Sequence, residues 1–356
     1  MESSKNVLIC AGGTGGHVVP ALTIAKRLIE DGYKPFIIGT GKDLEKTIAT
    51  GIETRSVASC PPSANPIKAL KFFRTLSVGI RQSKKLIKEL KPVAVIGMGG
   101  YPSVPVVLAA RGKVPILIHE ANAIAGKANR FLERFADVVL VGFESTTGFK
   151  NQSRIEVVGN PLRWVDIPPF SQKAYELLGL DRSKKTILFF GGSQGANLLN
   201  DAFLSLPDKL ITREDLQWLM ISGKHLFEKM KDEVKSRGYQ NVKVLDFLVA
   251  MDRAYSVANL TITRCGAMTI SELECLGIPC VLIPKRPHIY DHQYLNAMYL
   301  KSKRECVILE QNELREKLAA SIEFELQRKR MPTECSHMHA VDNISEILKS
   351  LIGAIG

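Results

Sequence analysis

The chain has 356 residues and 45% of them are hydrophobic, so it can bury a core in each of two domains of roughly 150 residues. Its seven cysteines form no C-x-x-C pair and are odd in number, which disfavours a disulfide framework and a zinc site and indicates reduced thiols in a cytoplasm. Residues 1–160 hold +10 of the formal net charge of +12. Nucleic acid and an anionic membrane surface are the usual partners of such a field, and no RNP-type or zinc-finger pattern supports nucleic acid.

The N-terminal half alternates apolar runs with stretches of helical spacing. Strands are predicted at residues 6–11, 35–39, 93–97, 114–118 and 138–142, with helices over 21–29 and 67–90. This alternation predicts right-handed βαβ units and a parallel sheet. The apolar run before the first glycines is too short for a signal peptide. Glycines and prolines interrupt the longest uncharged stretch, 93–110, so no membrane span is expected.

The predicted helix at 67–90 is both basic and amphipathic. Its apolar residues recur at helical spacing: Ile67, Leu70, Phe73, Leu76, Ile80, Ile87 and Leu90. We expect most of this stripe to lie in the core, whereas Phe72 lies off the stripe among basic residues and is the better candidate for lipid contact. Each Lys or Arg near an anionic surface contributes roughly 1 kcal/mol, so several together can hold a protein there reversibly. The segment therefore predicts peripheral attachment to the cytoplasmic face of the plasma (inner) membrane.

The C-terminal half repeats the plan of the first half. Strands are predicted at residues 186–190, 217–221, 242–246, 260–263 and 280–283, with helices between them. Prolines between 160 and 169 predict a linker, which gives domains 1–162 and 163–337. Residues 331–337 are predicted as a loop. The segment 338–356 contains a closing amphipathic helix, which we expect to pack back on the N-terminal domain.

Two glycine-rich turns, one in each half, follow predicted strands. The first strand leads into GGTGGH at 12–17, and strand 186–190 leads into GGSQGA at 191–196. Glycines let backbone N–H groups crowd a bound anion, and the helix that follows points its positive end at the same place. Val18 takes the place of the third glycine of a dinucleotide fingerprint, and neither turn has the lysine of a P-loop. The turns therefore predict phosphate handling, but neither NAD binding nor ATP hydrolysis.

Three further polar clusters follow predicted strands: GMGGYPS at 97–103, HEAN at 119–122 and RCGAMTISE at 264–272. The carboxyl ends of strands are where open α/β sheets bind ligands. In the last cluster, the backbone amides and Thr269 can accept a diphosphate, and Glu272 lies near enough on the same helix to hold both ribose hydroxyls. A surface carboxylate is the alternative for Glu272, which its apolar neighbours Ile270 and Leu273 disfavour.

These motifs, with GNPLR at 159–163 and DHQ at 291–293 followed by Asn296 and Ala297, follow the pattern of one family in order. The chain resembles the MurG family, the UDP-N-acetylglucosamine:lipid I N-acetylglucosaminyltransferases of peptidoglycan synthesis. The resemblance spans nearly the whole chain. It implies an α/β GT-B fold of two Rossmann-like parallel-sheet domains that face each other across a cleft. It also implies inverting transfer of GlcNAc from UDP-GlcNAc to the 4-hydroxyl of the MurNAc unit in lipid I, which forms lipid II.

The same resemblance implies site residues in both domains. The N-terminal domain takes the lipid-linked acceptor. From this side, the residues implied to face the sugar and diphosphate are Thr14, Gly15, Gly16 and Asn122, and the acceptor-side candidates are Tyr101, Ser103 and Asn129. For the donor, UDP-GlcNAc, they are Arg163, Ser193, Leu248, Ala267, Met268, Thr269, Ile270, Ser271, Glu272 and Gln293. In this set Arg163 and Ser193 meet phosphate, Leu248 offers backbone to the uracil and Gln293 contacts the GlcNAc hydroxyls. The chain departs from the family pattern at Cys265, at 249–250 and at 285–290, which concerns local nucleotide contacts.

Inverting transfer requires a base for the acceptor proton and a means of stabilising the departing UDP. His17 is the leading candidate base, because the start of a helix disfavours the imidazolium form; positioning of substrate is the alternative. Glu120 could orient a base or act as one. No D-x-D pair is present to hold a metal, so we expect helix N-termini after Gly195 and Gly266, with Arg163, to supply the positive potential. Neither a metal nor a cofactor is expected.

Two other functions stay open at the level of sequence. The first is a GT-B glycosyltransferase that acts on another lipid acceptor, such as diacylglycerol. The second is a catalytically silent nucleotide-sugar-binding module. The presence of His17, Asn122, Glu272 and Gln293 argues against the second.

Overall fold

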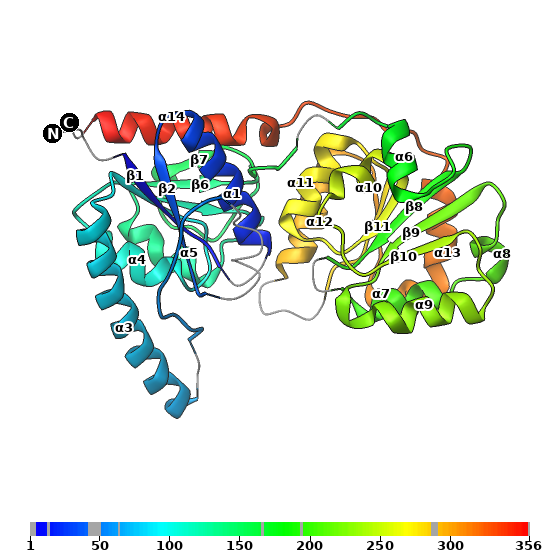
Figure 1. The fold of residues 1–356 in the computed structure, drawn as a ribbon, viewed down its shortest axis with the longest axis horizontal. Coiled ribbons are helices and arrows are strands. Elements are labelled where there is room, and N and C mark those ends of the chain that lie inside the picture. The colour runs from blue at the N-terminus through cyan, green and yellow to red at the C-terminus, as the bar shows by residue number, and fades with distance from the viewer. Residues whose placement is uncertain are drawn as a thin grey trace. The chain divides into compact units, whose positions relative to one another are not determined.

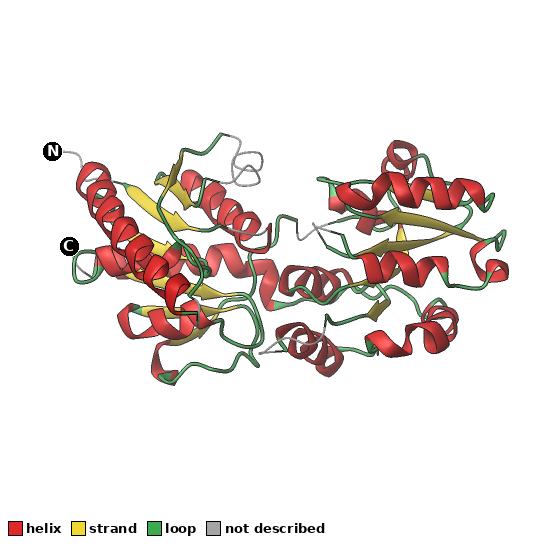
Figure 2. Cartoon of the chain, turned by 90° about the horizontal axis from the view of Figure 1, so that it is seen from below, coloured by secondary structure: helices red, strands yellow, loops and turns green. Residues whose placement is uncertain are grey.

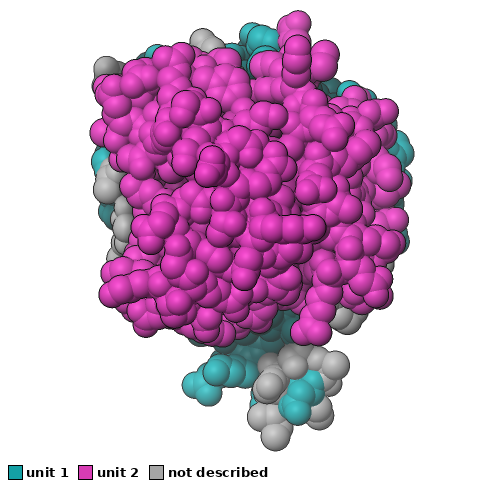
Figure 3. Space-filling view, turned by 90° about the vertical axis from the view of Figure 1, so that its right-hand side faces the viewer, with its two compact units in different colours: residues 1–163, 336–356 teal, residues 164–335 magenta. Residues whose placement is uncertain are grey.

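The computed structural model describes residues 5–12, 15–41, 51–62, 65–164, 167–192, 195–285 and 291–354. The chain divides into two compact units (Figure 1). Unit 1 comprises residues 1–163 and 336–356, and unit 2 comprises residues 164–335; Figure 3 colours them separately. Figure 2 shows helices on both faces of the sheet in each unit. The predicted fold class, two Rossmann-like α/β domains, is confirmed.

Unit 1 is built on a parallel sheet which, among the described residues, has the strand order β3-β2-β1-β4-β5-β6-β7. The strands are β1 (Asn6–Cys10), β2 (Lys34–Gly39), β3 (Thr54–Ser56), β4 (Ala94–Gly97), β5 (Ile116–Glu120), β6 (Val138–Val141) and β7 (Ile155–Val157). The helices are α1 (Gly15–Glu30), α3 (Pro66–Leu90), α4 (Ser103–Ala110), α5 (Lys127–Leu132) and α14 (Ala340–Gly353). The central strands β4 and β6 are apolar along their whole length because helices cover both faces of the sheet. In β1, Val7 and Ile9 enter one core while Leu8 and Cys10 enter the other.

The C-terminal helix α14 belongs to unit 1, where it packs against α1. Figure 1 shows the two helices beside each other. Ile344 and Leu348 of α14 are fully buried in the same core as Leu28 of α1. At the rim of this contact, Asp31 pairs with Lys349 Nζ at 2.9 Å and accepts a hydrogen bond from the Ser345 hydroxyl. These hydrogen bonds lower the pKa of Asp31 from 3.8 to about 2.

Helix α3 is buried along only part of its length. Its C-terminal half packs closely, since Gly79, Ser83 and Ile87 are buried and a Cβ at Gly79 would lie 2.1 Å from the carbonyl oxygen of Ala58. Further towards its N-terminus, Leu70 is 73% exposed and Phe73 is 64% exposed, and the helix extends away from the sheet (Figure 1).

The predicted core stripe on α3 is therefore wrong at Leu70 and Phe73, because the helix runs past the body of the unit and the described residues leave these two side chains exposed. Phe72, the residue predicted to meet lipid, is half-buried and makes an edge contact with the Phe73 ring. Within the described part of the chain, none of the helices combines the length and the apolar character that crossing a bilayer requires.

Unit 2 has a second parallel sheet, with the strand order β10-β9-β8-β11-β12-β13 among the described residues. The strands are β8 (Lys185–Phe190), β9 (Leu216–Ile221), β10 (Val242–Leu245), β11 (Ala258–Thr263), β12 (Cys280–Leu282) and β13 (Val307–Ile308). The helices are α6 (Gln172–Leu178), α7 (Asn197–Leu204), α8 (Asp208–Ile211), α9 (Phe227–Ser236), α10 (Met251–Val257), α11 (Ala267–Leu276), α12 (His292–Lys303) and α13 (Leu314–Glu325). Trp218 of β9 is the largest fully buried side chain of this core.

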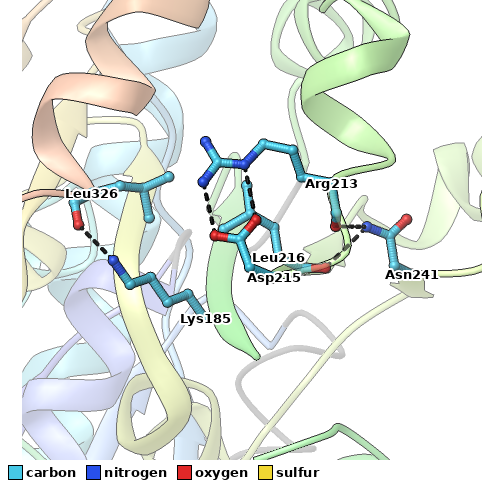
Figure 4. A network of polar contacts seen from close by, with 6 residues as sticks. All are labelled: Lys185, Arg213, Asp215, Leu216, Asn241 and Leu326. Carbon is cyan, nitrogen blue, oxygen red and sulfur yellow. Dashed lines mark hydrogen bonds and ion pairs between the residues drawn. The ribbon is translucent and has the colours of Figure 1, made fainter. Parts of the chain in front are cut away.

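Polar contacts close the end of this sheet at which β8 and β9 begin (Figure 4). Lys185 Nζ donates to the carbonyl of Leu326 at 3.2 Å, and the Arg213 guanidinium pairs with Asp215 at 2.7 Å. Asn241 donates to the carbonyl of Leu216 at 3.0 Å. These contacts lie at the amino ends of the strands. They therefore stabilise the end of the sheet that is opposite the glycine-rich segment after β8.

The expectation that every cysteine is a free thiol is wrong for two of the seven. Cys275, near the end of α11, forms a disulfide with Cys335, the last residue of unit 2. The pairing follows from tertiary packing, because segment 331–335 lies along the end of α11: the amide of Met331 donates to Gly277 and that of Thr333 to Cys275. Because the two cysteines lie 60 residues apart, no spacing pattern in the sequence indicated that they pair. The other five cysteines are free.

Candidate active site

Each sheet has one point at which the strand order reverses, and the glycine-rich turns lie there. In unit 1 the reversal places β1 beside β4, and in unit 2 it places β8 beside β11. Strands β1 and β8 end just before the glycine-rich motifs, of which residues 12, 15–17, 191–192 and 195–196 are described, while β4 and β11 lead into segments 98–102 and 264–266. Ligands of open α/β sheets bind outside the carboxyl ends of strands at such a switch point. Each unit therefore presents a candidate ligand-binding site at the carboxyl ends of its strands. The residues at this site belong to the glycine-rich and polar motifs of the sequence.

In unit 1, the ring of His17 packs against the turn that follows β4. His17 lies in the first turn of α1, and Gly99 and Gly100 have φ angles of +82° and +74°. A Cβ at Gly99 would lie 3.5 Å from His17 Nε2 and 3.3 Å from Asn129 Nδ2. Glycine is favoured here because the backbone is left-handed and approaches these side chains closely. The turn, the imidazole and Asn129 thus form one compact group.

Opposing effects set the protonation of His17. Removal of water from around the partly exposed ring lowers its pKa, and this effect is larger than the opposing ones from the negative charge of Glu120 and the hydrogen bond to Gly12. The positive end of α1 also disfavours the charged form. The side chain is therefore a neutral imidazole at neutral pH, which can accept a proton.

Glu120 is a buried carboxylate at the end of β5, with donors on both oxygens. Oε1 accepts from the backbone and side-chain nitrogens of Asn122 at 3.0 and 2.9 Å. Oε2 accepts from the amide of Gly126 and from Asn129 Nδ2, both at 2.9 Å. Four donors on one side chain fix the course of residues 121–129. The arrangement supports a positioning role for Glu120 beside His17.

The other predicted residues of unit 1 differ in how accessible they are. Ser103 is buried, and its hydroxyl donates to the carbonyls of Gly99 at 2.9 Å and Cys10 at 3.2 Å, so it joins the ends of β4 and β1. Asn129 is buried as well, whereas Tyr101 is 42% exposed and Asn122 is half-buried. Among these candidates, Tyr101 and Asn122 are the ones with surface to offer a ligand. Gly15 and Gly16 begin α1, and Thr14 lies outside the described residues.

In unit 2, the turn after β8 packs tightly onto the end of β9. Gly195 has a φ of +73°, and a Cβ there would lie 2.4 Å from the carbonyl oxygen of Ser222. Asn200 of α7 donates to the same carbonyl at 3.3 Å. Glycine is therefore required at 195 for the turn to enter α7. Ser193 lies outside the described residues.

Helix α11 starts directly after β11 and presents its N-terminus at the switch point. Gly266 is the cap residue, and Met268 and Thr269 are partly exposed in the first turn. Arg264, just before the helix, is buried and donates to the carbonyls of Ile283 at 3.1 Å and Pro284 at 3.3 Å. It thereby fixes the end of β12 relative to the start of α11. Free N–H groups and the helix dipole make such a start suitable for an anion.

Behind α11, a buried tyrosine contacts the predicted ribose-binding residue. Tyr255 Oη donates to Glu272 Oε2 at 2.7 Å. Sequence reasoning missed Tyr255, because an aromatic residue on a short helix before a strand is usually a core residue. No spacing rule connects positions 255 and 272.

Comparison with known proteins identifies the family. The model of the glycosyltransferase family 28 N-terminal domain matches residues 7–141, and that of the C-terminal domain matches residues 186–351. A UDP-N-acetylglucosamine--N-acetylmuramyl-(pentapeptide) pyrophosphoryl-undecaprenol N-acetylglucosamine transferase of Finegoldia magna is 35% identical over 86% of this chain and 85% of its own. The transferase of the same name from Thermoanaerobacter sp. strain X514 is 33% identical over 97% of this chain and 99% of its own.

A solved structure agrees with the sequence relatives. The crystal structure of Acinetobacter baumannii MurG is 28% identical, with a TM-score of 0.71 over 97% of this chain and 99% of that one. The chain belongs to the MurG family. It is therefore an N-acetylglucosaminyltransferase of the GT-B fold, which confirms the predicted family and enzyme class.

The remaining donor-side candidates of this glycosyltransferase lie in several environments. Ile270 and Ser271 are fully buried, so their side chains face the core of unit 2. Leu248 is half-buried in the segment before α10. Gln293, in the first turn of α12, accepts a hydrogen bond from the amide of Lys285 at 2.8 Å. Arg163 is the last residue of the first segment of unit 1 and is half-buried.

Proposed function

We propose that this enzyme makes lipid II, by transferring GlcNAc from UDP-GlcNAc to the 4-hydroxyl of the MurNAc unit of lipid I. The observation that carries the proposal is the placement of both glycine-rich turns at the switch points of their sheets, in a chain related over nearly its full length to transferases named for this reaction. The reaction belongs to peptidoglycan synthesis, with UDP as the second product.

In the proposed chemistry, unit 1 supplies the base. The acceptor hydroxyl gives its proton to the neutral imidazole of His17 while its oxygen attacks the anomeric carbon of GlcNAc. The bond from that carbon to the diphosphate oxygen breaks, and UDP leaves with the electron pair. Glu120 does not take the proton; it orders residues 121–129 and its charge favours the imidazolium that forms.

Unit 2 binds the donor in this proposal. The N-terminus of α11, with Thr269, takes the diphosphate, Glu272 takes the ribose hydroxyls and the backbone at Leu248 takes the uracil. The dipoles of α11 and of the helix after Gly195, together with Arg163, offset the charge that develops on UDP. Ile270 and Ser271 contribute through backbone and packing, because their side chains are buried. Gln293 contacts GlcNAc, and its side-chain oxygen also accepts a hydrogen bond from the amide of Lys285.

The exposed turns of α3 are proposed to attach the enzyme to the cytoplasmic face of the inner membrane. Leu70 and Phe73 are exposed on a helix whose described basic side chains are Lys71, Arg74, Arg81, Lys84, Lys85 and Lys88. An apolar pair surrounded by cations combines burial in the headgroup region with attraction to anionic lipid. Attachment of this kind keeps a lipid-linked acceptor within reach.

The decisive experiment is transfer of radiolabelled GlcNAc from UDP-GlcNAc with lipid I and diacylglycerol offered side by side, each with and without a chelator. We expect label only in the lipid I product, at the same rate in both conditions. Label in diacylglycerol would assign the other lipid acceptor, and UDP binding without transfer to either would assign a silent binding module. Loss of transfer with the chelator would contradict the metal-independent mechanism.

A further inference from the structure

Tyr255 is held from several sides beneath the proposed donor site. The residue lies on α10 and is 1% exposed. Its ring makes an edge contact with Phe190, the last residue of β8, at 6.2 Å between ring centroids. Its carbonyl accepts a hydrogen bond from Arg330 Nη1 at 3.0 Å, while Arg330 Nε donates to Leu276 at the end of α11. The phenol therefore has little freedom to move relative to α11.

The hydroxyl of this phenol contacts a residue of the proposed donor site. Tyr255 Oη donates to Glu272 Oε2 at 2.7 Å. Burial and the negative charge of Glu272 both raise the pKa of Tyr255, so the phenol keeps its proton and remains a donor. A direct hydrogen bond thus links the phenol on α10 to the Glu272 carboxylate on α11.

We infer that Tyr255 is a positioning residue for ribose recognition, which holds the Glu272 carboxylate in the orientation that accepts the ribose hydroxyls of the donor. The inference rests on the proposed function, because it takes UDP-GlcNAc as the donor. A free glutamate side chain loses several rotamers when it binds a ligand, so a fixed donor on one carboxylate oxygen reduces that cost beforehand.

The opposite assignment is that Glu272 only satisfies a buried phenol and does not meet the ribose. The two assignments differ in one measurable respect. If Tyr255 acts through the ribose, its hydroxyl affects UDP but has no effect on an analogue that lacks both ribose hydroxyls. If the pair is only structural, loss of the hydroxyl affects both ligands alike.

The test compares Tyr255→Phe with Tyr175→Phe in the full-length enzyme. Tyr175 is a matched control: it is 3% exposed in the same unit, and its hydroxyl donates to the carbonyl of Val257 at 3.4 Å. Calorimetry gives the Kd of UDP and of 2′,3′-dideoxy-UDP, and kinetics give the KM for UDP-GlcNAc and kcat. Each ratio of UDP to dideoxy-UDP comes from one protein preparation, so a partly unfolded fraction cancels.

For Tyr255→Phe we expect the Kd of UDP and the KM for UDP-GlcNAc to rise about tenfold, the loss typical of a hydrogen bond to a charged group. The Kd of dideoxy-UDP and kcat at saturating donor stay within about twofold, and Tyr175→Phe changes none of these values. In a Glu272→Ala background, Tyr255→Phe has no further effect, because the carboxylate it positions is gone.

An equal change in the Kd of UDP and dideoxy-UDP, or no change in either, overturns the inference while leaving lipid II synthesis intact. A further loss in the Glu272→Ala background overturns it as well. If the unmodified enzyme binds no UDP, the proposed donor is wrong and the inference falls with it. Lipid II synthesis by the unmodified enzyme separates these cases.

Discussion

His17 has the position, the neutral charge state and the neighbours that a general base requires. Because burial lowers its pKa below 6.5, the imidazole is unprotonated over most of the physiological range. A base works in its unprotonated form, so kcat/KM should be flat near neutral pH and fall only below about pH 6.5. The measurement is the pH profile of kcat/KM for lipid I. An acid limb whose midpoint lies above 6.5 would contradict the lowered pKa.

The same residue gives a direct mutational prediction. His17→Ala should lower kcat by about 10²–10⁴-fold, the contribution usual for a positioned base, and should leave the Kd of UDP unchanged. His225→Ala is the control, because His225 is an exposed histidine of unit 2. Near-normal turnover of His17→Ala would restrict His17 to positioning the substrate. The acid limb of the pH profile should also disappear in this variant.

The sequence predicted where the candidate residues lie in the fold better than what each of them contacts. Glycine turns and strand ends mark a switch point in the sequence, so His17 and Glu272 could be named as candidates without coordinates, and their roles stay predictions. Whether a polar side chain faces a ligand or the core depends on tertiary contacts. For that reason Ser103 could not be recognised as a link between two strands, and Tyr255 gave no signal at all.

At the scale of elements, the exposed turns of α3 predict membrane binding. Leu70→Ala combined with Phe73→Ala should weaken binding to vesicles of anionic phospholipid about tenfold or more, since each large apolar side chain contributes about 1.5–3 kcal/mol when fully buried. Thermal stability should stay the same, because both side chains are exposed. The measurement is sedimentation with vesicles at low and high salt.

A matched control for this experiment lies in unit 2. Leu177 is 53% exposed and Phe324 is 54% exposed, so their double alanine variant removes similar apolar surface away from α3. We expect this control to bind vesicles like the unmodified enzyme. If both double variants lost binding equally, the apolar part of the attachment would not belong to α3. Binding that persists unchanged in high salt would remove the basic residues from the proposal.

The disulfide between α11 and the end of unit 2 gives a stability prediction. It closes a loop across 60 residues, and Cys335→Ser should therefore destabilise unit 2 by about 2–4 kcal/mol. Thermal unfolding without reductant measures this loss, and Cys60→Ser is the control because Cys60 is a free, partly exposed cysteine. A thiol titration of the denatured, unreduced protein should find five thiols. Seven thiols in that titration would show that the disulfide does not form.

Most elements could be predicted from sequence because their strands are continuous apolar runs between helical stretches. The structure adds the edge strands β3, β7 and β13, which have two or three residues each. Strands this short show no alternation of apolar and polar residues from which they could be predicted. The partial exposure of α3 could not be predicted either. Amphipathic spacing indicates which face of a helix is apolar, but it does not indicate how far the body that covers that face extends.

At the scale of the whole molecule, unit 1 is formed by two segments that are far apart in the sequence. The chain leaves unit 1 after Arg163 and returns at Ser336, and the two segments meet where the amide of Asn160 donates to His337 Nδ1 at 2.8 Å. Helix α14 then completes the core that β1 and α1 begin. Unit 1 therefore cannot be complete until residues 336–354 have been synthesised, whereas unit 2 consists of one continuous segment.

Deleting residues 336–356 should accordingly destabilise unit 1 and leave unit 2 folded. The loss should be several kcal/mol, because Ile344 and Leu348 alone contribute about 1.5–3 kcal/mol each by burial. Limited proteolysis and calorimetry of the shortened chain distinguish the two units.

Asp31→Asn tests the polar rim of the same contact. The lowered pKa of Asp31 stabilises the folded protein above about pH 3.8, and this contribution is lost as the pH falls through about 2. The variant should therefore be less stable than the unmodified enzyme at neutral pH and nearly equal to it at pH 2, and equal stability at neutral pH would show that the ion pairs of Asp31 do not hold α14 in place.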